Sequence, residues 1–213
     1  MSRKSLIIPF LPPVKTDPEI TEISRLLEKR EKHAVGTAPW PEFNDRPLVQ
    51  FSIAHNGDAI LLKYDVEEAE TLARYTQPND PVYRDSCVEF FIAFDDGGYY
   101  NLEFNSLGTC LGAYGPDRNN RTAQSPTLLQ TIQYHTETKH SGKPLSAWSL
   151  TVAIPLAVFS FHSFASLQGI TCRANFYKCG DDLQQSHYLV WNNIEWPEPN
   201  FHLPEFFGEV EFL

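Results

Sequence analysis

The sequence predicts an all-β protein, a jelly-roll-like β-sandwich of about ten antiparallel strands with one helix near the N-terminus. Aromatic residues are abundant, with 15 Phe, 9 Tyr and 4 Trp in 213 residues, and they favour strands. Gly and Pro together add 27 residues, which is typical of many short turns. Short apolar runs recur along the chain without an internal repeat or a linker, so we expect one domain over residues 1–213.

Residues 16–33 carry the single helix signal and, with the loop to residue 47, form an N-terminal appendage in this prediction. Thr16 and Glu19 have the spacing of a capping box, and Pro18 suits a first helical turn. Ile20, Ile23 and Leu27 share one face.

Strand patterns follow the helix. The runs 48–54 and 60–66 flank His55-Asn56-Gly57-Asp58, which is a hairpin turn signal. Further strands are expected at 87–94, 99–105, 108–114, 129–135, 148–154, 171–178, 188–191 and 208–213, with a short helical turn within 155–164.

The two runs 87–94 and 99–105 alternate clearly between apolar and polar positions. Val88, Phe90, Ile92 and Phe94 lie on one face, as do Tyr100, Leu102 and Phe104, and these predict the core. Pairing each residue i with 194 − i leaves a three-residue loop at 96–98 and places Glu89 opposite Asn105. The opposite face then carries polar side chains: Glu89, Asn101, Glu103 and Asn105.

Charge and cysteine usage restrict the classes of partner. The net charge of −10 disfavours nucleic acids and anionic membranes. Cys87, Cys110, Cys172 and Cys179 form no CxxC pair, so we expect ordinary buried thiols and neither a metal site nor disulfides. The apolar stretch 6–14 holds three prolines and resembles neither a signal peptide nor a membrane span, which favours a cytoplasmic location.

The usual catalytic motifs are missing from the sequence, including GxSxG, the Walker loop, GxGxxG after a strand and HExxH. The polar face suits a sugar, because sugar hydroxyls need donors and acceptors and the ring stacks on aromatic side chains. Trp196 stands beside Pro197 in a rigid loop near Asn193 and offers such a ring. Two alternatives stay open: a glycoside hydrolase using Glu89 and Glu103, and a structural or protein-interaction domain.

Several segments resemble family 9 carbohydrate-binding modules, in particular a single-domain branch. They are Tyr83–Ile92, Tyr99–Gly108, Trp148–Pro155, Asn175–Asp181 (NFYKCGD), His187–Trp191 and Phe201–Gly208, within residues 40–213. The resemblance implies non-catalytic sugar binding in support of glycan-degrading enzymes, with structural calcium ions and no other cofactor. It further implies that Tyr83 and Trp196 clamp a sugar while Glu89, Asn193 and Arg118 bind its hydroxyls. Asn105 joins these candidate ligands because it lies on the polar strand face opposite Glu89 in the predicted pairing.

Overall fold

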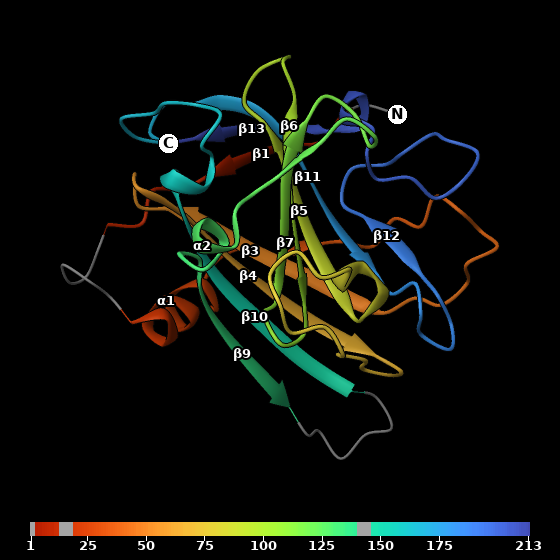
Figure 1. Ribbon diagram of the computed structural model, residues 1–213. Coiled ribbons are helices and arrows are strands. Elements are labelled where there is room, and N and C mark those ends of the chain that lie inside the picture. The colour runs from red at the N-terminus through yellow and green to blue at the C-terminus, as the bar shows by residue number, and fades with distance from the viewer. Residues whose placement is uncertain (1–2, 13–18, 140–145) are drawn as a thin grey trace.

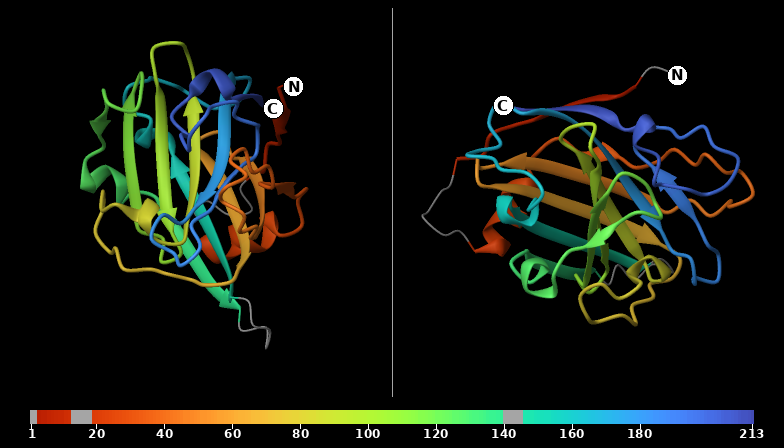
Figure 2. Two further views of the ribbon diagram at one scale, coloured as in Figure 1. Left: turned by 90° about the vertical axis from the view of Figure 1, so that its right-hand side faces the viewer. Right: turned by 45° about the horizontal axis from the view of Figure 1, so that its top comes forward.

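The computed structural model describes residues 3–12, 19–139 and 146–213. These residues form two β-sheets that pack face to face, which confirms the predicted β-sandwich (Figure 1). Side views show the same two layers with loops covering the outer side of the larger sheet (Figure 2). No helix in the described part of the chain is long and apolar enough to cross a membrane.

The larger sheet has eight strands. Its order is β1 (Ser5–Ile8), β13 (Gly208–Phe212), β11 (Thr171–Cys179), β5 (Cys87–Ala93), β6 (Tyr99–Asn105), β7 (Cys110–Gly115) and β8 (Thr122–Ala123), with β12 (Tyr188–Val190) also paired to β11. One pair, β1 with β13, is parallel, whereas the sequence predicted antiparallel strands throughout.

The smaller sheet has five strands in the order β2 (His33–Ala34), β3 (Leu48–His55), β4 (Ala59–Glu68), β10 (Ser146–Pro155) and β9 (Gln133–Lys139). The remaining elements are α1 (Ile20–Leu27), α2 (Pro126–Leu129) and three 3₁₀ turns, η1 (Val82–Arg84), η2 (Leu156–Val158) and η3 (Pro204–Phe206). The strand expected from residue 129 starts four residues later, because Ser125 caps α2 by accepting a hydrogen bond from the amide of Leu128.

The predicted helix is present but shorter, as α1. Thr16 and Pro18 lie outside the described residues, and Glu19 makes no side-chain capping hydrogen bond. Ile23 and Leu27 pack against the outer face of the smaller sheet, as predicted from their shared helix face. The segment that follows the helix packs into the sandwich, since Val35 belongs to the main hydrophobic core.

The predicted hairpin at residues 55–58 is confirmed. His55 pairs with Ile60, Gly57 has a positive φ of 93°, and Asn56 Oδ1 accepts hydrogen bonds from the amides of Asp58 and Ala59. The turn therefore has the Asn-Gly chemistry that its sequence indicated.

The hairpin of β5 and β6 has a different register from the predicted one. Glu89 lies opposite Glu103, and Cys87 lies opposite Asn105. The loop contains five residues, 94–98, because Phe94 leaves the strand to pack against Phe159 and Phe164. The slip is two residues, so each side chain keeps its predicted face and the alternating apolar residues do form the core.

A buried ion network joins the two sheets through inner strands of each. Lys178 on β11 is completely buried, and its Nζ lies 2.8 Å from Glu68 Oε2 on β4 and 2.8 Å from His187 Nε2. Trp148 Nε1 donates to the other Glu68 oxygen, and His187 Nδ1 lies 2.9 Å from Asp45. The network holds two charges that water cannot reach, so removing one partner leaves the other uncompensated.

We expect Lys178→Met to lower the free energy of unfolding by about 3 to 5 kcal/mol, because Glu68 then stays buried without a cation. Adding Glu68→Gln should restore part of that loss. The matched control is Lys63→Met, whose partner Glu28 is 46 % exposed, and its expected loss is about 1 kcal/mol or less. Urea denaturation measures all three values, and equal losses for the two lysine variants would contradict the buried-network interpretation.

Candidate functional site

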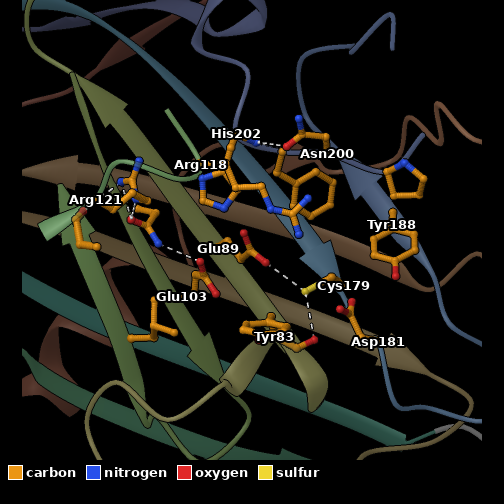
Figure 3. A pocket seen from close by; sticks show the side chains of 15 residues that line it. Tyr83, Glu89, Glu103, Arg118, Arg121, Cys179, Asp181, Tyr188, Asn200 and His202 are labelled. Carbon is orange, nitrogen blue, oxygen red and sulfur yellow. Dashed lines mark hydrogen bonds between the residues drawn. The ribbon is translucent and has the colours of Figure 1, made fainter. Parts of the chain in front are cut away.

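A cavity of about 380 Å³ opens on the outer face of the larger sheet, beneath the loops after β7, β11 and β12. Polar, charged and aromatic side chains from strands and loops surround it (Figure 3). Its lining consists of Tyr83, Glu89, Asn101, Glu103, Leu111, Ala113, Arg118, Arg121, Cys179, Asp181, Tyr188, Pro199, Asn200, Phe201 and His202.

Two carboxyl groups from neighbouring strands form the floor. Glu89 on β5 and Glu103 on β6 are directly opposed and are only 3 % and 4 % exposed. Glu89 Oε1 accepts a hydrogen bond of 3.0 Å from the Cys179 thiol, and Glu103 Oε1 accepts one of 2.8 Å from the Asn101 amide. Glu103 Oε2 is buried and has no hydrogen-bond partner among the described residues. Glu103 also lines the cavity, and an unpartnered buried oxygen beside it favours a hydrogen bond from an ordered water or a ligand.

Both floor carboxyls retain their protons more strongly than an exposed glutamate does. Burial raises the pKa of Glu89 well above its usual value, and the nearby Cys179 and Glu103 raise it further. Burial also raises the pKa of Glu103 to about 7, although the Asn101 hydrogen bond and the Arg121 guanidinium oppose this change. The floor can therefore offer both hydroxyl donors and carboxyl acceptors near neutral pH.

The two arginines of the cavity have different roles. Arg121 lies over the Tyr99 ring at 4.2 Å and donates to Asn101 Oδ1 and to the Tyr99 carbonyl, so its guanidinium is held in place. Arg118 is exposed and makes no hydrogen bond or ion pair with any residue that the structure describes. Figure 3 shows its guanidinium extending over the cavity, where it can donate to a ligand.

Aromatic side chains line the walls. Tyr83 belongs to η1, and its carbonyl accepts a hydrogen bond from the Asp181 amide, which ties this turn to the loop after β11. Tyr188 comes from β12, and Phe201 stacks on Tyr177 with ring centroids 4.2 Å apart. Together these rings supply flat apolar surface beside the polar floor.

His202 completes the upper wall in an uncharged state. Its Nδ1 lies 2.9 Å from the Tyr99 hydroxyl. Burial lowers the pKa of His202 to about 3, and Arg121 and Arg118 add to this decrease. A neutral imidazole can donate to a ligand hydroxyl or accept from it, depending on its tautomer.

Three of the residues proposed from the sequence meet in this cavity: Tyr83, Glu89 and Arg118. Asn105, Asn193 and Trp196 are not part of its lining. Asn105 is completely buried and holds a turn, donating to Asp85 and the Tyr75 carbonyl and accepting from the amides of residues 107 and 109. Trp196 is 45 % exposed, and its carbonyl accepts a hydrogen bond from Trp40 Nε1.

Several lining residues were not proposed from the sequence as sugar ligands. Asn101 appeared there only on the polar face, and Glu103 on that face and in the hydrolase alternative. Asp181, Tyr188, Asn200 and His202 were not singled out. Asp181, Asn200 and His202 come from loops over the sheet, and Tyr188 comes from the three-residue strand β12, so strand alternation gives no signal for them. The segments 175–181, 187–191 and 201–208 contain or adjoin them and were the available clue.

The structural calcium that the resemblance implied stays a prediction. Calcium takes oxygen ligands. The group of His, Cys, Asp and Glu side chains found close together among the described residues contains two sulfurs, from Cys87 and Cys179, beside Glu89. In the hairpin, Asp96 pairs with Arg173, and Asp95 accepts from the Gly97 amide and lies 3.0 Å from His162.

The contribution of Glu103 to stability should decrease as the pH rises from about 4.5 to 7. Folded Glu103 keeps its proton up to about pH 7, whereas an unfolded glutamate releases it near 4.5. At this residue the folded state therefore binds more protons than the unfolded state in this window, and its contribution to the free energy of unfolding falls with rising pH. Glu103→Gln is permanently neutral, so we expect the melting temperature of this variant, relative to that of the parent protein, to be higher at pH 8 than at pH 5. The same difference in melting temperature at both pH values would contradict the assignment.

Comparison with known proteins supports a relationship over the full chain. The sequence profile of carbohydrate-binding family 9 matches residues 21–212. A crystal structure of a presumed carbohydrate-binding protein from Bacteroides uniformis ATCC 8492 is 36 % identical, with a TM-score of 0.92 over 100 % of both chains. Comparison with curated proteins gives no match.

More distant structures share the fold. A family 9 module from Caldicellulosiruptor kristjanssonii in complex with glucose has 14 % identity and a TM-score of 0.60, covering 99 % of this chain and 96 % of that one. A family 9 module from the same organism with cellotriose has 16 % identity and a TM-score of 0.55, covering 98 % and 93 %. With the profile match over 21–212 and the 36 % identity, the chain belongs to carbohydrate-binding family 9.

Proposed function

We propose that the protein binds a sugar in the cavity on the outer face of the larger sheet, without chemical conversion. The observation that supports this most directly is the pair of buried carboxyl groups, Glu89 and Glu103, between aromatic walls in a member of family 9. A sugar presents hydroxyls to such a floor and apolar ring faces to such walls.

Each group has a definable contribution to this binding. Glu89 and Glu103 bind hydroxyls from below, and Arg118 donates from above. Tyr83 and Tyr188 contact the ring faces. The small volume suits one sugar or the end of a short oligosaccharide, and such ligands bind modestly, with Kd values from about micromolar to millimolar.

The hydrolase alternative receives less support from the geometry. A glycosidase places its two carboxyl groups on either side of the bond to be cleaved. Glu89 and Glu103 project from adjacent strands of a single sheet face, so both approach a ligand from the same side. The relation to glycan-degrading enzymes stays a prediction.

Isothermal titration with glucose, cellobiose and cellotriose tests the site. We expect Tyr83→Ala to weaken binding about 10-fold, because it removes an aromatic wall. Trp196→Ala is the matched control, since this exposed ring lies outside the cavity lining, and we expect its affinity to stay within about twofold of the parent protein.

Three outcomes would contradict the proposal in different ways. Absence of binding heat with every sugar, extended to xylose and galactose oligomers, would argue against carbohydrate binding itself. A large loss in Trp196→Ala with no change in Tyr83→Ala would place the sugar elsewhere. Turnover of aryl glycosides that Glu89→Gln abolishes would favour the hydrolase alternative instead.

A further inference from the structure

Two cysteines and a glutamate converge beneath the cavity. Cys87 on β5 and Cys179 on β11 are direct cross-strand partners, so their side chains emerge on the same face. Glu89 is two residues beyond Cys87 and shares that face. One donor atom from each of the three side chains lies within 4.8 Å of the others, and all three residues are buried.

We propose that Cys87, Glu89 and Cys179 bind a thiophilic divalent cation, with Zn²⁺ as the physiological ion. Two thiolates and a carboxylate form a donor set that Zn²⁺ accepts in tetrahedral sites. Ligand atoms around such an ion lie roughly 3.5 to 3.8 Å apart, so the unliganded cluster needs only small side-chain movements to close on it.

The contacts that Cys87, Glu89 and Cys179 make in the structure are weak compared with coordination to a cation. The Cys87 sulfur lies 3.7 Å from the Val88 carbonyl, and the Cys179 sulfur lies 3.5 Å from the Tyr83 carbonyl. The strongest contact in the cluster is the 3.0 Å hydrogen bond between Cys179 and Glu89, which joins two acidic groups. A divalent ion would replace the protons that these acids now share and would compensate their charge in a buried place.

The cavity supplies both access and a vacant coordination position. Cys179 and Glu89 line it, so an ion can reach them from solvent, while Cys87 lies beneath. These three side chains leave the fourth tetrahedral position on the open side, where water or a ligand hydroxyl can bind. Cysteine binds a cation as the thiolate, so ion binding must displace protons and should strengthen as the pH rises.

Another buried cysteine, Cys172, provides an internal comparison. Cys172 belongs to the apolar core between the sheets, on the opposite face of β11 from Cys179, and is not part of the cluster. It is therefore a thiol of similar burial that should contribute nothing to the site. Ion binding does not require the proposed sugar, so the two proposals can fail separately.

Titration of the reduced, metal-free protein with Co²⁺ tests the proposal, because thiolate ligands give charge-transfer absorption in the near ultraviolet and tetrahedral Co²⁺ absorbs in the visible. We expect one equivalent of Co²⁺ to bind with both signals, and Zn²⁺ to displace it. Cys179→Ser should lose the charge-transfer signal and weaken binding at least about 100-fold, and Glu89→Gln should weaken it about 10-fold or more. Cys172→Ser should behave like the parent protein.

Circular dichroism and a melting curve establish that each variant is folded, and Cys179→Ala serves as a second variant if Cys179→Ser is not. Absence of both signals in the folded parent protein would overturn the proposal. The proposal would also fail if Cys179→Ser kept the charge-transfer signal, if Cys172→Ser lost it equally, or if thiol titration under the reducing conditions found Cys87 and Cys179 joined as a disulfide.

Discussion

Burial of both faces of the larger sheet is the constraint on which the rest of this structure depends. The inner face of β5, β6 and β11 packs into the apolar core between the sheets. The outer face is covered by loops that bring Trp40, Phe201 and Phe207 over Tyr177 and Phe91 in a second core. Polar side chains among these residues are therefore withdrawn from water instead of being solvated.

This constraint explains why the cavity is chemically unusual. A carboxyl on an open sheet face would ionise normally, but Glu89 and Glu103 lie under the loops and retain protons. Their burial is tolerated because Asn101, Arg121 and Cys179 provide partial compensation. The remaining unpartnered oxygen on Glu103 is typical of a site that completes its hydrogen bonds only when a ligand is present.

Burial of both faces of the larger sheet also determines the surroundings of Lys178 and His187. Adjacent residues on β11 point to opposite sides of the sheet, so Lys178 reaches the ion pair with Glu68 while Cys179 reaches the cavity. One short stretch of sequence therefore helps hold the two sheets together and also contributes to the candidate site. A substitution of Lys178 should act on the ion pair between the sheets, and a substitution of Cys179 should act on the cavity. Measurements of stability and of binding can separate the two effects.

Sequence patterns predicted the β-sandwich, the apolar inner face of β5 and β6 and the Asn-Gly hairpin, because alternation and turn chemistry are local properties. The family resemblance, and not these local patterns, assigned Tyr83, Glu89 and Arg118 to one candidate site. The tertiary structure sets the pairing of Glu89 with Glu103, since a two-residue slip preserves every face and Phe94 packs against residues of a distant segment. It likewise decided that Trp196 stays outside the cavity while Tyr188, Phe201 and His202 enter it. Those positions follow from how loops pack over the sheet, and loop packing depends on contacts between residues far apart in the chain.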